Sequence, residues 1–354
     1  MGKFVILGGG YGGLTLALHL LEQDPPHGTE IVLIDRMPYQ GLKTEYYALA
    51  AGTVSEAEIR VAFPTDPRII LKYGEVTGVD LDNKLVMMDQ NDPVSYDWLV
   101  IALGCVDKFH GIIGADTYAH GIQTLSASRK TYQAINDLNP YSQVSIVGGG
   151  LSGVEIASEL RESRPDLNIR MIDRSASILS SFPDKLQAYV RDWFIEHDIE
   201  MLSRVSLQRV EPGMLYNGEQ EISTDLTVWT AGIQPSPIVQ NLDLPKDNQG
   251  RVLLNEYHQV PAYPEVFVVG DCASLPFSPS AQAAEGQGRQ VAEVMHALWK
   301  GEKPVMKPIK LKGVLGSLGK NAGFGMMGKK TVIMGKVPRV LKSGVLWMSK
   351  HHFG

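Results

Sequence analysis

Near its N-terminus the chain reads Phe4-Val5-Ile6-Leu7-Gly8-Gly9-Gly10-Tyr11-Gly12-Gly13. An apolar run typical of a buried strand meets glycines spaced Gly8-x-Gly10-x-x-Gly13, and a helical pattern rich in leucine follows. In a dinucleotide-binding fingerprint the first glycine allows a sharp turn, the second lets a diphosphate approach the backbone, and the third lets helix and strand pack closely. The helix also points its free N–H groups at the phosphates. This segment therefore predicts a β-α-β unit that binds a dinucleotide.

An acidic residue supports this interpretation. A second apolar run at 30–34 ends at Asp35, where a carboxylate suits the hydroxyls of an adenosine ribose. The alternative is a glycine turn in an ordinary β-α-β unit. The strand before the glycines, the helix after them and the acid that ends the next strand favour the fingerprint.

The same pattern returns in the middle of the chain. An apolar run at 144–147 leads into Gly148-x-Gly150-x-x-Gly153, a helix follows, and the next strand ends at Asp173. Such a repeat predicts an α/β protein with two dinucleotide sites. Asp173 also predicts a preference for NADH over NADPH, because a carboxylate accepts a hydrogen bond from a ribose 2′-hydroxyl and repels a 2′-phosphate. The neighbouring Arg174 argues the other way, since an arginine at this place could hold that phosphate.

Composition narrows the class of protein. A length of 354 residues suggests two to three domains, and 44% hydrophobic with 20% charged residues allows a sizeable core rather than disorder. The two cysteines, Cys105 and Cys272, lie far apart and favour a reducing compartment. The N-terminal glycines argue against a signal peptide, so we expect a protein that is not exported. No apolar run approaches the roughly 18 residues that span a bilayer.

Charge is unevenly distributed along the chain. The net charge is −6, yet residues 303–354 contain 11 Lys and Arg and no Asp or Glu. Near the end, Val337, Val340, Leu341, Gly344, Val345 and Met348 recur at helical spacing, with Arg339, Lys342, Ser343 and Lys350 off that face. This pattern predicts a basic amphipathic helix that binds an anionic membrane surface. The alternative is a helix that packs its apolar face on the body of the protein or on a second subunit.

Between and after the two fingerprints the local signals are shorter. Alternating runs at 69–76 and 84–88 predict antiparallel strands, and residues 125–138 predict a helix. Residues 310–334 alternate glycine with apolar residues, as short strands and turns do.

The order of landmarks resembles the two-dinucleotide flavoprotein reductases. The segments that carry the likeness are the two fingerprints and residues 96–104, 229–235 and 265–273. The chain lacks the cysteine pair of disulfide reductases and sulfide:quinone reductases. Ala281-Gln282-Ala283-Ala284-Glu285-Gly286 is similar to the Ala-Gln-x-Ala-x-Gln helix of type II NADH dehydrogenases, with Gly286 in place of the second glutamine. Lys312-Gly313, Leu318-Gly319 and the basic end also resemble that branch.

The resemblance implies an α/β fold with two Rossmann-like domains and a small membrane-associating C-terminal segment. An FAD-binding domain would comprise residues 1–110 and 239–302, with an NAD(P)H-binding domain inserted at 111–238 and a basic amphipathic segment at 303–354. Non-covalent FAD would contact Gly8, Gly10, Gly13, Asp35, Arg36, Lys43, Val76, Ala102, Gly104, Asp271, Gln282 and Ala283. The nicotinamide nucleotide would contact Gly148, Gly150, Gly153, Glu155, Asp173, Ala231 and Gly232.

Three residues are candidates for catalysis. Lys312 would stabilise the anionic reduced flavin by its charge, Glu155 would lie near nicotinamide and flavin, and Gln282 would position flavin or acceptor through its amide. Each has a simpler alternative, namely a surface lysine, an acid favoured by the helix dipole, and a polar residue at a helix start. No metal site is expected.

The implied activity is hydride transfer from NADH to flavin and then to a quinone, at the cytoplasmic side of the cell membrane. The implied partners are NADH, a quinone or other small acceptor, an anionic membrane surface and a second copy of the chain in a homodimer, with no nucleic acid. Two alternatives stay open: a soluble NAD(P)H reductase of a small redox protein, and a nucleotide-responsive flavin-binding protein with little turnover.

Overall fold

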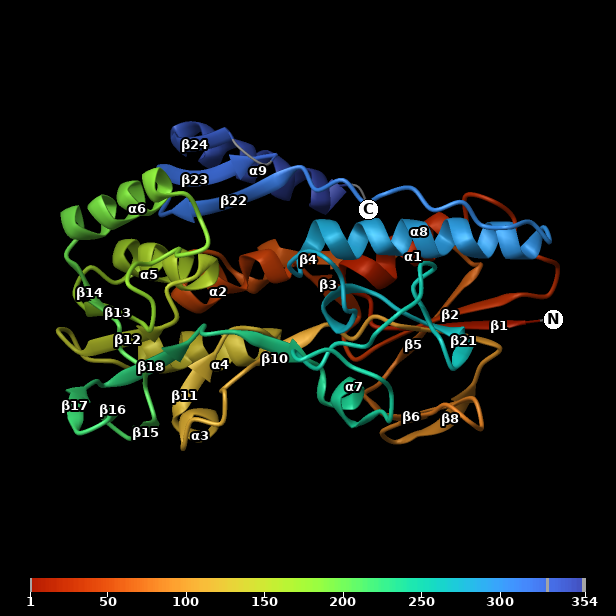
Figure 1. Cartoon of the computed structure of the whole chain (residues 1–354), viewed down its shortest axis with the longest axis horizontal. Coiled ribbons are helices and arrows are strands. Elements are labelled where there is room, and N and C mark those ends of the chain that lie inside the picture. Colours follow the sequence, from red (N-terminus) through yellow and green to blue (C-terminus); the bar gives the residue numbers. More distant parts are fainter. Residues whose placement is uncertain (1, 329–330, 352–354) are drawn as a thin grey trace.

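The computed structural model describes residues 2–328 and 331–351. Figure 1 shows an elongated molecule with two α/β halves side by side, one containing β1 and the other β12. A smaller sheet and the last helix lie across the top, over the half that contains β12. The two glycine fingerprints therefore belong to different halves of the molecule.

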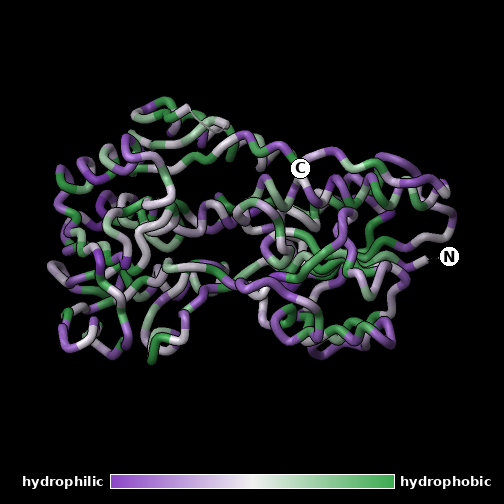
Figure 2. The backbone as a smooth tube through the Cα atoms, viewed as in Figure 1, coloured by the Kyte–Doolittle hydropathy of each residue, from purple (hydrophilic) through white to green (hydrophobic). Residues whose placement is uncertain are grey.

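The first half is built on a six-stranded sheet with strand order β20-β21-β9-β1-β2-β5. Its strands are β1 (Lys3–Leu7), β2 (Glu30–Asp35), β5 (Ile69–Tyr73), β9 (Trp98–Ile101), β20 (Gln259–Val260) and β21 (Tyr263–Val268). The central strand β1 is parallel to β2 and β9, and its residues Phe4 to Leu7 are fully buried. Figure 2 shows hydrophobic residues gathered on these central strands. Helices α1 (Tyr11–Leu20) and α8 (Ala281–Trp299) pack against each other beside this sheet.

One local prediction is wrong in this half. β5 pairs in parallel with β2 as an edge strand of the main sheet, whereas the alternating pattern predicted an antiparallel strand. Alternation reports that one face of a strand is solvated, and an edge strand of a parallel sheet meets that condition as well.

The second half contains a five-stranded parallel sheet with strand order β11-β18-β12-β13-β14. Its strands are β11 (Ala119–Gly121), β12 (Gln143–Val147), β13 (Asn168–Asp173), β14 (Ile199–Ser203) and β18 (Leu226–Trp229). The longer helices of this half are α4 (Leu125–Asn136), α5 (Leu151–Ser163) and α6 (Asp184–Glu196). All of these strands lie in sequence between β9 and β21 of the first sheet.

Shorter elements connect and cover the halves. The chain leaves the first half through β10 (Cys105–Asp107) and returns to it through β19 (Ile233–Pro235). These two strands pair in antiparallel. The remaining strands are β3 (Tyr39–Gly41), β4 (Arg60–Ala62), β6 (Val76–Asp80), β7 (Leu85–Met88), β8 (Asn91–Ser95), β15 (Arg209–Glu211), β16 (Met214–Asn217) and β17 (Gln220–Ser223). The remaining short helices are α2 (Tyr46–Ala51), α3 (Ala115–Tyr118), α7 (Pro237–Asn241) and the 3₁₀ turns η1 (Lys43–Glu45), η2 (Glu56–Ile59) and η3 (Gly270–Cys272).

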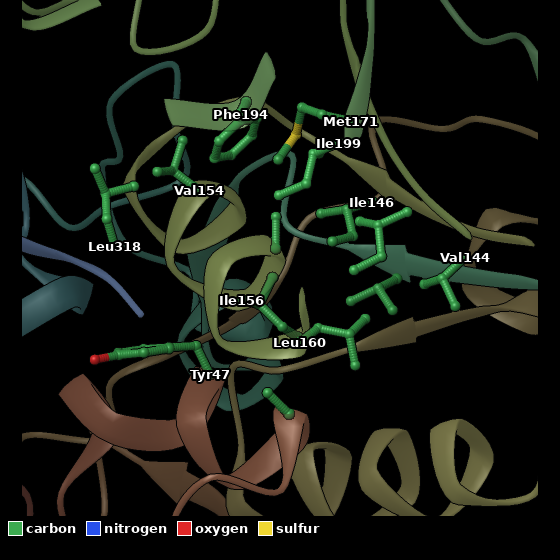
Figure 3. Packing of buried hydrophobic residues seen from close by; sticks show 14 of the residues in the cluster. Tyr47, Val144, Ile146, Val154, Ile156, Leu160, Met171, Phe194, Ile199 and Leu318 are labelled. Carbon is green, nitrogen blue, oxygen red and sulfur yellow. The ribbon is translucent and has the colours of Figure 1, made fainter. Parts of the chain in front are cut away.

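The C-terminal part forms an antiparallel sheet and a helix. The sheet contains β22 (Gly313–Leu318), β23 (Ala322–Met327) and β24 (Thr331–Gly335), and α9 (Lys336–His351) follows. Leu318 of β22 and Tyr47 of α2 join Val154 and Ile156 of α5 in one buried cluster (Figure 3). Because this cluster contains residues of three regions of the chain, the C-terminal sheet is packed on the core of the second half.

Candidate active site

The glycines of the first fingerprint serve two different purposes. A Cβ on Gly8 would lie 2.6 Å from the Ala102 carbonyl oxygen, and one on Gly13 would lie 2.0 Å from the Gly8 carbonyl oxygen. These two positions need glycine because backbone approaches backbone. A Cβ on Gly10, by contrast, would meet nothing within 4 Å. Gly10 caps the N-terminus of α1 and borders open space, which is where a diphosphate has to approach the backbone.

Asp35 holds the glycine loop in shape. Its Oδ2 accepts a hydrogen bond from the Gly9 N–H at 2.7 Å, and its Oδ1 accepts one from the Met37 N–H at 2.8 Å. Burial raises the pKa of Asp35, and these amide hydrogen bonds oppose that rise. Each carboxylate oxygen has a second lone pair, so the anchored side chain can still accept from a ribose hydroxyl at the cavity wall.

The second fingerprint repeats this construction. Asp173 accepts from the N–H groups of Gly149 and Ser175, each at 2.6 Å. A Cβ on Gly153 would lie 1.9 Å from the Gly148 carbonyl oxygen, and a Cβ on Gly150 would meet nothing within 4 Å. Gly148 has a φ of +110° and lies against Ala231, beside Gly232. The two β-α-β units are therefore matched in detail as well as in sequence.

One cavity of about 1730 Å³ extends from the first fingerprint to α9. Most of the predicted site residues line it: Gly8, Gly10, Asp35, Arg36, Lys43, Val76, Ala102, Gly104, Glu155, Asp271, Gln282 and Lys312. The other predicted residues lie outside the lining: Gly13, Ala283, Gly148, Gly150, Gly153, Asp173, Ala231 and Gly232. The second unit reaches this cavity through Leu151, Ser152 and Glu155 at the start of α5.

A half-buried cation, Lys43, lies at the wall of this cavity. The Lys43 ammonium donates to the Cys105 carbonyl oxygen at 3.1 Å and to its Sγ at 2.9 Å, and it lies 3.8 Å from Asp271. Burial alone would lower the pKa of Lys43, but Cys105 and Asp271 oppose it and the net shift is upward. Lys43 therefore stays charged beside Asp271.

Both cysteines are neutral packing residues. Burial raises the pKa of Cys105 and of Cys272 to about 12, and the Cys272 thiol donates to the Gly104 carbonyl oxygen at 3.0 Å.

Gln282 fixes the segment that carries Lys312. Its Nε2 donates to the Gly313 carbonyl oxygen at 2.9 Å, and its Oε1 accepts from the Lys312 N–H at 2.8 Å. The amide that was predicted to position flavin or acceptor is thus engaged with backbone. Packing explains why position 286 is a glycine, because a Cβ there would lie 2.7 Å from the side chain of Ile309.

Lys342 was missed as a site residue. The sequence placed it on the polar face of the last helix, yet only 9% of it is exposed. Its ammonium pairs with the Glu155 carboxylate and donates to the Tyr47 hydroxyl at 2.6 Å and to Ser317 Oγ at 3.1 Å. The Ser317 N–H donates to Glu155 at 3.1 Å. Burial would lower the pKa of Lys342, but Glu155, Tyr47 and Glu45 oppose it and the net shift is upward.

The apolar face of α9 points away from the protein. Val340 is 69% exposed and Trp347 61%, while Pro338 and Lys342 are buried. The alternative in which this helix packs its apolar face on the body of the protein is therefore wrong. Within residues 2–328 and 331–351 no helix has both the length and the hydropathy to cross a bilayer. Residues 352–354, at the end of the predicted basic segment 303–354, lie outside the described residues.

Comparisons with known proteins agree with this construction. A model of the family described as pyridine nucleotide-disulphide oxidoreductase matches residues 2–297. The NADH dehydrogenase-like protein YutJ of Bacillus subtilis is 52% identical over 100% of both chains. Demethylphylloquinone reductase NdbB of Synechocystis sp. is 32% identical over 77% of this chain and 72% of that protein. NDH2 of Plasmodium falciparum, solved in complex with NADH, superimposes with a TM-score of 0.84 over 99% of this chain and 96% of that chain, at 18% identity.

Proposed function

This chain belongs to the pyridine nucleotide-disulphide oxidoreductase family, and from that premise we propose that it oxidises NADH through bound FAD and passes the electrons to a quinone. When bound, FAD would supply the redox chemistry, since it can accept a hydride and pass the electrons on. The chain fits that cofactor, because Gly10 leaves an open approach to the positive end of α1 and Asp35 stands beside it. Lys43 and Asp271 add a fixed charge pair at the same wall.

The quinone assignment rests on where the cavity leads and on the residues that line it there. Beyond the glycine loop it is lined by apolar residues of β22 and α9: Val314, Leu315, Val345, Leu346 and Met348. Val314, Val345 and Met348 are also exposed at the surface. A lipophilic acceptor can therefore enter from the uncovered face of α9 without leaving an apolar environment, and transfer of apolar surface out of water favours that path.

The test is an acceptor comparison on the purified protein. We expect it to retain FAD and to oxidise NADH rapidly with ubiquinone-1, and slowly with oxygen or with a ferredoxin. Faster turnover with the ferredoxin would establish a reductase of a small redox protein instead. Flavin binding with negligible NADH oxidation for every acceptor would establish a nucleotide-responsive binding protein.

We expect NADH to be preferred over NADPH. The anchored carboxylate of Asp173 ends β13, where it repels a 2′-phosphate. The ratio of kcat/KM for the two nucleotides should be at least about tenfold, which corresponds to about 1.4 kcal/mol of differential binding. Stopped-flow reduction of the flavin by each nucleotide measures it. A larger kcat/KM with NADPH would contradict the assignment, and Arg174→Ala would then show whether the arginine holds the phosphate.

We also propose that the protein binds the cytoplasmic membrane surface through α9. Basic residues near an anionic surface contribute about 1 kcal/mol each, screened by salt, and the exposed apolar face adds burial. The intact protein should therefore float with anionic vesicles at low salt and be released at high salt. Val340→Asp with Trp347→Ser should abolish flotation while preserving flavin content. These substitutions are more informative than deletion of the helix, which would also remove the buried Lys342. Absence of flotation at low salt would refute membrane binding.

A further inference from the structure

Glu45 is a buried carboxyl group at the wall of the cavity. It ends η1 and immediately precedes α2, and only 4% of it is exposed. It lines the cavity together with Glu155, Lys342 and the apolar residues of α9. Nothing in the glycine fingerprints or in the helix that resembles type II NADH dehydrogenases pointed to this residue. The structure thus places a second acid beside the pair formed by Lys342 and Glu155.

The hydrogen bonds of Lys342 distinguish the two acids. An ammonium group has three N–H donors, and those of Lys342 are directed to Glu155, Tyr47 and Ser317. The Glu45 carboxylate lies 3.8 Å from the Lys342 ammonium, beyond hydrogen-bond distance. Glu155 is therefore held tightly as the partner of the cation, whereas Glu45 is free to gain and lose a proton at the cavity wall.

The proposed reaction requires such a group. In the overall balance, NADH, one proton and a quinone give NAD⁺ and a hydroquinone. The hydride from NADH carries two electrons and one proton, so the second hydroxyl of the hydroquinone needs a proton from elsewhere. We propose that Glu45 donates this proton. Its O–H bond breaks as a new O–H bond forms on the acceptor oxygen, and the carboxylate regains a proton from water at the open end of the cavity.

The direction of the pH dependence follows from the surroundings of Glu45. Burial raises the pKa of Glu45 to about 6, against the attraction of Lys342. The other titratable and charged groups that face it come from four elements: Tyr11 of α1, Tyr47 of α2, Glu155 and Glu159 of α5, and Arg339 of α9. The donor form is present below pH 6 and is lost as the pH rises through that value. Quinone reduction should therefore slow above about pH 6.

The inference rests on the proposed quinone reductase activity, so its test uses two acceptors. Ubiquinone-1 requires the proton, whereas ferricyanide takes electrons without one. A general acid typically contributes about 10²–10⁴-fold, and water in the open cavity replaces part of that. We expect Glu45→Gln to lower kcat for ubiquinone-1 at pH 6 by about tenfold to a hundredfold. The decline above pH 6 should vanish, while ferricyanide reduction and flavin content should match the wild type. Glu45→Asp, which keeps the carboxyl group, should restore part of the rate.

Two control variants complete the design. Glu293→Gln removes an exposed carboxyl group that lines the same cavity on α8, and it should behave like the wild type. Asp107→Asn removes a second buried acid, on β10 and outside the cavity lining, whose pKa burial raises to about 6, and the pH dependence should persist in this variant.

Each result has a defined meaning. A wild-type rate and pH profile with ubiquinone-1 in Glu45→Gln would overturn the proposal. So would an equal loss with both acceptors, which would mean that Glu45 acts on the fold or the flavin, or a pH dependence that disappears in Asp107→Asn. If the wild type reduces ferricyanide but not ubiquinone-1, the quinone assignment itself fails and this inference fails with it.

Discussion

Replacing Gly10 with valine should give a folded protein that purifies without flavin. Gly10 has φ −77° and ψ −167°, an extended conformation that valine adopts without strain. A Cβ there meets no protein atom within 4 Å, so the fold accommodates the branched side chain. The same side chain occupies the space through which the diphosphate approaches the N-terminus of α1. We expect a loss of about 3 kcal/mol of binding free energy or more, which is at least about a hundredfold in FAD affinity.

The second fingerprint provides a matched control. Gly150 has φ −79° and ψ −171°, and a Cβ there also meets nothing within 4 Å. Gly150→Val should retain FAD and lose reduction by NADH. Absorbance at the flavin bands, thermal melting and stopped-flow reduction separate these outcomes. Full flavin occupancy in Gly10→Val would rule out the assignment of FAD to the first unit.

Replacing Lys342 with methionine should strongly destabilise the protein. The ammonium is the close cationic partner of Glu155, which is itself buried. Removing one member of a buried ion pair costs about 3–5 kcal/mol, because the remaining charge is left uncompensated or must be neutralised. Methionine preserves most of the apolar volume, so the loss reports chiefly on charge. The measurement is the free energy of unfolding from denaturant titration.

A double substitution tests that explanation. Glu155→Gln combined with Lys342→Met removes both charges, and most of the lost stability should return, since replacement of a whole buried pair is often nearly neutral. Lys336→Met serves as the control, because Lys336 is an exposed lysine of the same helix. A loss below about 1 kcal/mol in Lys342→Met, the range of exposed ion pairs, would mean that the pair contributes no more than a surface contact.

The sequence alone predicted the parts of this protein that depend on local geometry. Gly13 is required because its backbone meets that of Gly8 within the same turn, and that requirement is visible in the spacing of the glycines. Asp35 and Asp173 each end the second strand of a β-α-β unit, and each accepts a hydrogen bond from the glycine loop after the first strand of that unit. The pattern at 310–334 predicted short strands and turns, and helical spacing predicted the helix after them; the structure has β22, β23, β24 and α9 there. Twelve of the predicted site residues line one cavity. Gly8, Gly10 and Asp35 are among them because they lie at the turn after β1 and at the end of β2.

Only the tertiary structure decided how the last helix is used. Helical periodicity assigned an apolar and a basic face to residues 337–350, but it carries no information about which face turns inward. The partner that draws Lys342 into the interior is Glu155, 187 residues away in sequence, and Glu45 joins them from the other half. The engagement of the Gln282 amide with the backbone of Gly313 was likewise hidden. A buried ion pair forms only where segments distant in sequence bring opposite charges together out of water. No local sequence pattern shows which distant segments will meet.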